Sequence, residues 1–405
     1  MRPYDWPDRV VQFMSPESLS SNPGRGSIPA HSSAGPSRGY SIERITSEEG
    51  LANLQADWNR LSETSEQPNV FMTYDWFRAW NQRRAQEQRK GQRRPEVLAL
   101  KKEGAVAGIA PWIYRATRHF GIEVRRLEFL ASPADYNDFT VGADPAGQID
   151  AIVEYLVQTK DQWDLVELNS LRDTGGAKAR IQQALSLTKL SYRTLPEERC
   201  PYLPIETNWS GIVAKLSHSS RRTLRNQHYR LERMRAEGLQ IRIVEDPKAE
   251  SGLIARLVTL EAQKRIGGKL MPPLIGRYPE VFQSLFETLG SRGWIYIALM
   301  ELGGRLLAWQ LGFRCGKVLW DYSKAYDRSF ARLSPGTMLI PAVLDYGYSH
   351  GLTEYDFLRD DEEPYKLKWS TGFHETFRLQ IWSRRGSSWA HRVWGAVYRP
   401  SDSPR

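Results

Sequence analysis

Cysteine is scarce in this sequence of 405 residues, in which Cys200 and Cys315 are the only two thiols. They lie far apart, and neither has a His or Cys beside it at the spacing of metal ligands. We therefore expect no disulfide framework, no zinc site and two reduced, buried thiols. No stretch of about 18 apolar residues occurs. The first residues also lack the apolar segment of a secretory signal, so we expect a cytoplasmic protein.

Motifs of two common enzyme classes are missing as well. The sequence contains no Gly-x-x-x-x-Gly-Lys-Ser/Thr and no His-Glu-x-x-His, which disfavours P-loop nucleotide hydrolysis and zinc proteolysis. The string Asp135-Tyr136-Asn137-Asp138 does not have the spacing of a calcium loop, and we interpret it as a turn with Asx caps. We expect no metal cofactor.

Charge and length narrow the classes further. The net charge is +9, which favours anionic partners such as nucleotides, nucleic acid, acidic glycans or a membrane surface. Apolar residues make up 40% and charged residues 25% of the chain, as in an ordinary globular protein. A chain of this length is too long for one core, so we expect two domains.

The two ends of the chain are polar. Residues 1–40, rich in Ser, Pro and Gly, contain too few periodic apolar residues to offset the entropy lost on ordering. We expect a disordered N-terminal arm there and a loose C-terminal tail over residues 386–405.

Between these ends lies a weak internal repeat. Segments 97–112 and 296–313 each consist of an apolar run, a turn pair and a second apolar run, which predicts two β-hairpins. The turn pairs are Glu103-Gly104 and Gly303-Gly304. After each hairpin the sequence predicts another strand, then a helix with one apolar face, then a further strand. These helices and last strands are expected at 149–157 and 164–168 in the first half, and at 339–347 and 354–358 in the second.

This repeated order predicts an α+β fold. We expect two tandem lobes at residues 41–204 and 205–385, each a mostly antiparallel sheet flanked by helices with one helical crossover near its end.

A basic helix is predicted at the start of the second lobe, over about residues 217–237. Ser side chains offer N-caps, and Gly238 ends the helix. Residues 215–235 contain seven Lys or Arg against one acid, Glu232. Such a helix can be a solvated face, a clamp on an anionic acceptor or lipid surface, or a nucleic-acid patch. Nucleic acid is disfavoured because interleaved aromatic residues are missing.

Several strings in a fixed order give the chain a family resemblance. The late strings are Tyr326-Asp327, Ser334-Pro335-Gly336, Tyr355-Asp356-Phe357-Leu358-Arg359 and Pro364-Tyr365-Lys366-Leu367-Lys368-Trp369. Together with the aromatic segment 71–80, they resemble the GNAT superfamily over about residues 45–385. Within it they are similar to the CelD-like acetyltransferases of bacterial cellulose biosynthesis, and the two lobes also resemble the peptidoglycan aminoacyltransferases. Residues 360–363 depart from this pattern, because acidic residues stand where the branch usually has Gly.

The resemblance implies an acyltransferase that moves an acyl group, in particular acetyl, from acyl-CoA to an amine or hydroxyl acceptor. The CelD-like branch implies a glycan acceptor in exopolysaccharide or cellulose biosynthesis, while the residues themselves leave open a sugar hydroxyl, an amino sugar or a peptide amine. Two alternatives stay open. One is a non-catalytic interaction protein with a degenerate transferase fold that binds a glycan synthase or membrane peripherally. The other is an aminoacyltransferase that uses an aminoacyl-tRNA donor.

The predicted donor site lies at a helix start. Free amides at a helix N-terminus bind anions, so we predict that Ser334, Gly336 and Thr337 hold the pyrophosphate of the donor. We predict a further phosphate contact from Lys366. Ser followed by Pro is also an ordinary helix start, and Lys366 could simply extend from a packed surface. The Gly-rich loop of GNAT enzymes is reduced here to one Gly, which keeps the non-catalytic alternative open.

Acyl transfer also needs a base for the acceptor proton. The acidic candidates are Asp356, Asp321 and Glu362, with Asp356 as first choice. In a strand, its neighbours Tyr355 and Phe357 point to the face opposite Asp356. A partly buried carboxylate with a raised pKa suits a base.

Each catalytic assignment has a structural alternative. Asp356 could instead form an ion pair with Lys366 or Arg359. Tyr322 is the candidate acid for the leaving thiolate, and on a strand it could equally be a core residue.

Overall fold

The computed structural model describes residues 39–65, 67–87, 93–119, 122–129, 134–139, 141–142, 144–173, 176–215, 218–266, 269–270, 273–359 and 364–383. The predicted arm up to residue 38, the predicted tail and the candidate base Glu362 lie outside these ranges. Within them, no helix has the length and apolarity needed to cross a bilayer.

The secondary structure alternates between strands and helices throughout the described chain. In the first half the elements are β1 (Tyr40–Ile45), α1 (Glu48–Thr64), η1 (Val70–Met72), α2 (Tyr74–Glu87), β2 (Arg93–Lys102), β3 (Ala105–His119), β4 (Ile122–Phe129), β5 (Val141–Gly142), α3 (Pro145–Gln158), β6 (Leu165–Arg172), α4 (Ala177–Ser186) and β7 (Ser191–Pro204). In the second half they are α5 (Trp209–Lys215), α6 (His218–Ala236), β8 (Leu239–Val244), η2 (Pro247–Ala249), α7 (Leu253–Glu261), β9 (Arg265–Ile266), β10 (Lys269–Leu270), α8 (Leu274–Arg277), α9 (Pro279–Ser291), β11 (Ile295–Leu302), β12 (Arg305–Cys315), β13 (Val318–Tyr326), η3 (Arg328–Leu333), α10 (Pro335–Met338), α11 (Ile340–Ser349), β14 (Glu354–Asp356), α12 (Pro364–Trp369) and β15 (Gly372–Trp382).

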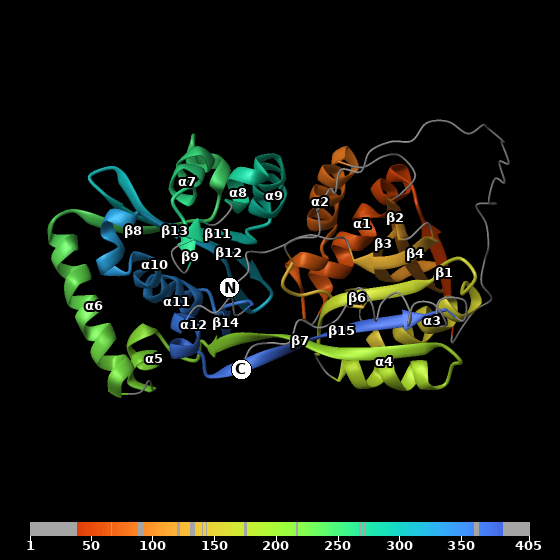
Figure 1. Ribbon diagram of the computed structural model, residues 1–405. Helices are drawn as coiled ribbons and strands as arrows, with labels where there is room; N and C mark the ends of the chain where they lie inside the picture. Colours follow the sequence, from red (N-terminus) through yellow and green to blue (C-terminus); the bar gives the residue numbers. More distant parts are fainter. Residues whose placement is uncertain are drawn as a thin grey trace.

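The described strands, apart from β9 and β10, form one thirteen-stranded sheet flanked by helices (Figure 1). Its order is β1-β2-β3-β4-β6-β15-β7-β14-β13-β12-β11-β8, with β5 beside β3. Most neighbours are antiparallel, and the parallel pairs β4–β6 and β13–β14 each enclose a helical crossover. This confirms the predicted α+β class.

The two predicted hairpins repeat each other in detail. Both turn pairs adopt the left-handed backbone that a tight two-residue turn requires, with φ of 52° and 84° at Glu103 and Gly104, and of 58° and 76° at Gly303 and Gly304. Each hairpin also has a register shift just before its turn, at Leu100/Lys101 in β2 and at Met300/Glu301 in β11. The internal repeat predicted from the sequence is therefore a repeat of structure.

The predicted basic helix is α6, which lies at the outer edge of the second half (Figure 1). Leu231 and Met234 are buried, and most of its described arginines face solvent. The helix ends where the amide of Gly238, at φ 96°, donates to the carbonyl of Arg235 over 3.0 Å. The predicted thiols Cys200 and Cys315 are both buried and unpaired with each other.

Two long strands, β7 and β15, join the two halves (Figure 1). By its place in the chain β15 falls in the expected second lobe, yet it pairs with β6 along one edge and with β7 along the other. The end of β7 then pairs with β14 of the second half. The sheet therefore runs through the expected boundary at residue 204 without a break.

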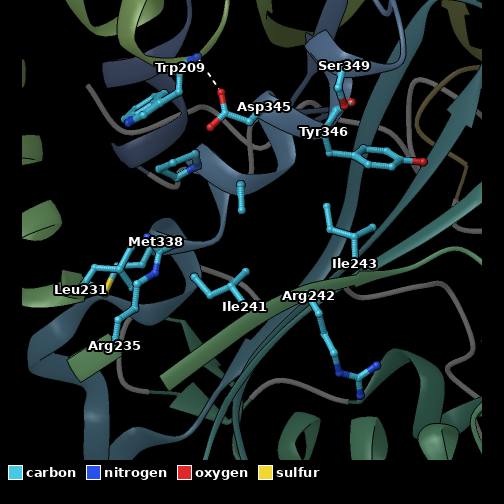
Figure 2. Close-up of a pocket in the computed structure, with 12 residues that line it drawn as sticks. Trp209, Leu231, Arg235, Ile241, Arg242, Ile243, Met338, Asp345, Tyr346 and Ser349 are labelled. Carbon is cyan, nitrogen blue, oxygen red and sulfur yellow. Dashed lines mark hydrogen bonds between the residues drawn. The ribbon is translucent and has the colours of Figure 1, made fainter. Parts of the chain in front are cut away.

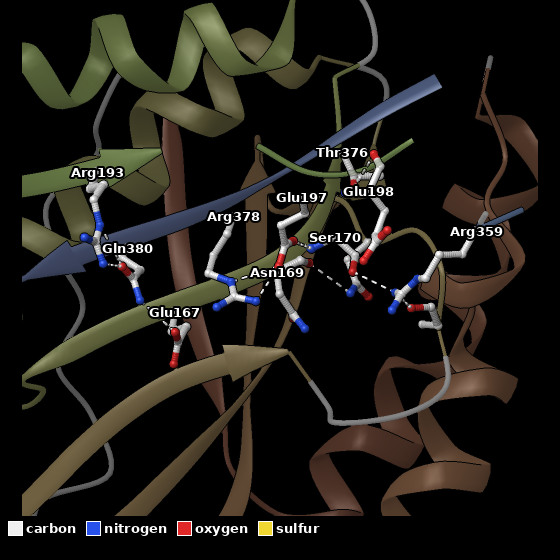
Figure 3. Close-up of polar contacts among 12 residues, drawn as sticks. Glu167, Asn169, Ser170, Arg193, Glu197, Glu198, Arg359, Thr376, Arg378 and Gln380 are labelled. Carbon is white, nitrogen blue, oxygen red and sulfur yellow. Dashed lines mark hydrogen bonds and ion pairs between the residues drawn. The ribbon is translucent and has the colours of Figure 1, made fainter. Parts of the chain in front are cut away.

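Polar side chains hold this junction together (Figure 3). Glu197 of β7 accepts two hydrogen bonds from Arg378 of β15, over 2.8 and 2.6 Å, and one from the amide of Ser170 in β6 over 2.5 Å. Arg359 donates to the Ser170 hydroxyl over 3.1 Å, which extends the contact to the segment after β14. One partly buried network thus ties three strands to the predicted site segment.

An aromatic cluster forms the apolar contact between the halves. Phe71, just before α2, stacks on Trp320 of β13 with ring centroids 5.4 Å apart and planes 7° apart. Trp76 of α2 meets Phe313 of β12 edge-on at 5.7 Å. All four rings are buried. Because aromatic side chains bury large apolar areas, this cluster fixes the position of one half against the other.

We predict that Phe71→Ala lowers the free energy of unfolding by about 3–5 kcal/mol, because a fully packed ring is replaced by a cavity. Guanidinium denaturation followed by Trp fluorescence measures this. Leu187→Ala is the control, since Leu187 is 80% exposed and its truncation should cost less than about 0.5 kcal/mol. Equal effects of the two substitutions would contradict the proposed role of the cluster.

Candidate active site

The parallel strands β13 and β14 separate soon after they pair. Their register runs only from Val318–Glu354 to Trp320–Asp356. Beyond this point β13 continues to Tyr326 along β12, whereas the amide of Phe357 donates to the carbonyl of Pro201 in β7 over 2.9 Å. Within the described chain, no strand pairs with β13 on its β14 side after Trp320. On that side β13 is therefore an edge strand beyond Trp320, to which a further strand could be added.

The corresponding place in the first half is closed. There β4 and β6 also form a short parallel pair, from Arg126–Leu165 to Glu128–Glu167. Asn137 then lies beside the continuing β6, and its amide donates to the carbonyl of Ser170 over 2.8 Å. Its side chain donates to the carbonyl of Asn169 over 3.1 Å. The loop at 134–139, predicted as a capped turn, thus fills the gap between β4 and β6 from the β6 side, whereas the open edge in the second half belongs to β13.

A β-bulge shapes the open edge of β13. Leu311 pairs with Ser323 and Gly312 pairs with Asp321, so Tyr322 is the extra residue. Gly is required at 312, because a Cβ there would come within 2.3 Å of the Trp320 carbonyl and the Tyr296 ring. Without the bulge, residues three apart on a strand point to opposite faces; with it, they share one face.

The bulge brings Asp321 and Lys324 together as a buried ion pair. The Lys324 Nζ atom lies 2.5 Å from Asp321 Oδ2, and the two side chains are 12% and 1% exposed. No described group forms a hydrogen bond with Asp321 Oδ1. Lys324 also lies over the ring of Tyr365, 4.7 Å from its centroid. A buried pair with a free carboxylate oxygen is costly for a merely structural contact.

Neutral polar groups line the inner side of this pair. Gln310 donates to the hydroxyl of Tyr296 over 3.1 Å and to that of Tyr355 over 2.8 Å. Burial raises the pKa of both tyrosines well above the usual value, and the nearby negative charge of Asp321 raises it further. Both phenols therefore stay protonated.

The predicted donor site at α10 lies next to Lys324. A Cβ on Gly336 would stand 3.6 Å from Lys324 Cδ and 3.7 Å from a ring carbon of Tyr326, both ordinary contacts. Ser334, expected as the N-cap, has no side-chain capping bond; its backbone is left-handed at φ 52°. Its carbonyl accepts the amides of Thr337 and Met338. The Thr337 amide is thus already used inside the helix, which corrects our expectation that it faces the donor.

Asp356 lies in a second polar cluster, at the contact between the two halves. As expected, it points away from Tyr355 and Phe357, which belong to the core under α11. Its carboxylate accepts from the Tyr136 hydroxyl over 2.8 Å and from the Leu358 amide over 2.7 Å. The partners of Asp356 in these bonds are thus Tyr136 and Leu358, and not Lys366 or Arg359, which were the alternative ion-pair partners.

Charged neighbours surround Asp356 at slightly longer range. His374 Nε2 lies 4.0 Å from Asp356 and 2.9 Å from Glu354, which Arg172 approaches to 3.7 Å. Burial raises the pKa of Asp356 from its ordinary 3.8 to about 6, although Arg172, His374 and the two hydrogen bonds lower it. The ligand atoms of Glu354, Asp356 and His374 lie within 4.8 Å of one another and could reach one metal ion. Arg172 and Tyr136 already compensate these carboxylates, so the geometry is satisfied by protein groups.

Two predicted residues have other surroundings than expected. Tyr322 packs against Phe71, Trp76, Phe282 and Phe313, on the face of β13 opposite Asp321 and Lys324. Lys366 is buried in α12, and its ammonium donates to the carbonyl of Arg359. The structure therefore brings Asp321 and Gly336 together around Lys324, places Asp356 in a separate cluster, and sends Tyr322 into the core.

Sequence reasoning missed Lys324, Tyr136 and His374. Lys324 had a weak signal, as a cation in a strand three residues from a candidate acid. Tyr136 also had a weak signal in the sequence, as an aromatic residue within an acidic turn. His374 had none, because its strand comes from the far end of the chain.

Comparison with known proteins supports this fold. Residues 218–367 match the family model described as an acetyltransferase (GNAT) domain. Among solved structures, FemX is similar with a TM-score of 0.55 and 11% identity, over 80% of this chain and 95% of that one. The C-terminal domain of a putative lysylphosphatidylglycerol synthetase from Agrobacterium fabrum has a TM-score of 0.51 and 11% identity, over 86% and 96%. No curated protein matches the sequence. At these identities the likeness concerns the fold, and it confirms the predicted GNAT-like architecture.

The raised pKa of Asp356 predicts a pH-dependent contribution to stability. An acid whose pKa rises on folding stabilises the fold below its unfolded pKa of 3.8, and this contribution is lost as the pH rises through about 6. Relative to wild type, Asp356→Asn, which stays neutral, should gain about 3 kcal/mol of unfolding free energy between about pH 4 and about pH 7.

Urea denaturation of both proteins at a series of pH values and constant ionic strength measures this difference. Since all other groups are common to the two proteins, their titration cancels to first order. A difference that does not change with pH would contradict the shifted pKa.

Proposed function

We propose that the protein is an acyltransferase that uses an acyl-CoA donor bound by the second half of the chain. The match of residues 218–367 to the acetyltransferase model supports the reaction class. The single observation that carries the proposal is the open edge of β13 beside the start of α10. The first half has the same layout, and there the loop at Asn137 fills the gap between the two parallel strands by bridging to Leu171 of β6.

The open edge suits the chemistry of coenzyme A. The pantetheine arm carries two amides, which can pair with the backbone of β13 beyond Trp320 as an added strand would. The pyrophosphate would then lie near the amide of Gly336 and the ammonium of Lys324, where the helix start and a cation both favour negative charge. A backbone amide of the bulge can donate to the thioester oxygen as negative charge develops on it.

The reaction forms a bond from the acceptor nitrogen or oxygen to the thioester carbon and breaks the carbon–sulfur bond. The acceptor loses a proton, and the leaving thiolate gains one. Asp356 remains our first choice for the proton acceptor, with Asp321 as second. Because Asp356 is fully buried, we place Tyr136, which donates to it, or His374, which is 22% exposed, between Asp356 and the acceptor. For the thiolate, Lys324 replaces Tyr322 as candidate acid, since Tyr322 packs in the core.

The finer parts of the proposal concern the acceptor. The resemblance to CelD-like enzymes favours a glycan acceptor and an acetyl donor, with a role in polysaccharide or cellulose biosynthesis. FemX and the putative lysylphosphatidylglycerol synthetase share the fold with this chain, so an aminoacyl-tRNA donor is the alternative to test against acetyl-CoA.

Isothermal titration with acetyl-CoA tests the donor. We predict that Gly336→Glu raises the dissociation constant at least roughly tenfold, because a carboxylate would stand beside the phosphates. Because a Cβ at 336 meets only ordinary contacts, Gly336→Ala should keep the melting temperature of wild type; since Gly336 is buried, the melting temperature of Gly336→Glu is measured to show that a loss of binding is local. Gly336→Ala is the control and should bind like wild type. No heat from wild type at millimolar acetyl-CoA would support the non-catalytic alternative, and equal affinities of the variants would remove this site.

The ion pair of Asp321 and Lys324 gives a second test. Lys324→Met should lower the unfolding free energy by about 3–5 kcal/mol, because it leaves a buried carboxylate without its partner. Adding Asp321→Asn should restore most of that stability but neither donor binding nor acetyl transfer. Melting curves, titration and a free-thiol assay measure the three effects. If the double variant recovered activity together with stability, the pair would be structural only.

A further inference from the structure

A groove of about 490 Å³ lies in the second half of the chain, and Figure 2 shows the residues that line it. It is bounded by α6, β8, α11 and the start of α5. Its floor and walls are largely apolar, with the side chains of Leu231, Ile241, Ile243, Met338, Pro341 and Ala342. Such a lining is unfavourable in water and favourable around hydrocarbon.

The wall formed by α6 is strongly cationic. Arg222, Arg225 and Arg230 are exposed, and within the described chain neither Arg222 nor Arg225 has an ionic partner. Arg235 lines the groove itself and is partly neutralised by Glu232 at 2.7 Å. Tyr229 stands between these arginines and is 72% exposed. An exposed aromatic ring among cations is typical of a helix at a membrane interface.

The two ends of the groove differ in charge (Figure 2). Arg235 lies at one end. Asp345 lies at the other, where its carboxylate accepts from the amide of Trp209 over 2.8 Å. An elongated ligand with an anionic head and an apolar tail would therefore enter with its head at Arg235.

We propose that this groove holds an acyl chain of an anionic phospholipid while α6 lies on the surface of the same membrane leaflet. The arginines of α6 attract the phosphate groups, and the groove removes the chain from water. Nucleic acid fits these features less well, because it would use the charge of α6 and leave the apolar groove empty. The inference does not depend on the acyltransfer reaction and is tested without donor.

Vesicles of phosphatidylcholine, with and without phosphatidylglycerol, test the charge. Wild type should sediment with the mixed vesicles and not with phosphatidylcholine alone. The double variant Arg222→Glu/Arg225→Glu should bind the mixed vesicles at least roughly tenfold more weakly, since each basic side chain adds to the attraction. Arg180→Glu/Lys189→Glu changes the net charge equally at exposed positions of the first half and should bind like wild type.

Two further variants test the groove. Ala342→Trp fills it, and Ile241→Gln makes its floor polar on the edge strand β8. Each should weaken binding to the mixed vesicles roughly threefold or more while α6 keeps all its charges. Melting temperatures show whether either variant fails to fold. If one of them does, vesicle binding by the other variant tests the role of the groove.

Three results would overturn the proposal. The first is binding that follows the charge variants but ignores both groove variants. The second is wild-type binding to a bulk tRNA preparation with no binding to mixed vesicles. The third is full release from vesicles by free glycerol phosphate at the same phosphate concentration, which would show a simple anion site.

Discussion

The pairing of β14 with β7 is the constraint on which the candidate site depends. Residues Glu354–Asp356 are held on one side by β13 and on the other by the end of β7. The amide of Phe357 then donates to the carbonyl of Pro201 in β7, so the segment after β14 separates from β13 beyond Trp320. Because β7 is itself fixed along β15, and β15 along β6, this separation is imposed by the whole sheet. A single strand could not keep the edge of β13 open against the tendency of backbone groups to pair.

The same constraint explains why the repeated strand-and-helix unit has different roles in the two halves. In the first half, the crossover loop at Asn137 supplies backbone and side-chain groups that satisfy the free edge of β6. In the second half, the chain after β13 turns into η3 and α10, which leaves the edge beside a helix start and Lys324. One copy has thus become the partner that contributes Tyr136 to the other copy's Asp356. The contact between halves is then part of the site as well as of the core.

The buried charged residues of the second half lie near the separation of β13 and β14, although burying charge is costly. Asp356 is fully buried, and Asp321 and Lys324 form a pair that is nearly so. Groups of this kind are rarely retained for stability, since apolar residues of similar volume usually serve as well. Their concentration around the β13–β14 separation is typical of a site where protons and charge move. The cationic helix α6 lies close to this region, because Arg230 donates to the carbonyl of Arg332 in η3, just before α10.

Local pattern determined much of the fold. The hairpin turns, the helix on residues 218–236 and the strand at Asp356 followed from short-range rules of turn geometry, capping and alternation. The sequence also placed Asp321, Gly336 and Asp356 among the candidates. It could not show that Tyr322 packs in the core and Lys324 joins Asp321, because a bulge of one residue reverses which face a side chain takes. It could not show His374 near Asp356 or Asn137 beside β6 either, since those contacts join strands that are far apart in the chain. Strand pairing between distant segments determines these contacts. Such pairing depends on the energy of the whole sheet, which cannot be predicted from a short segment of sequence.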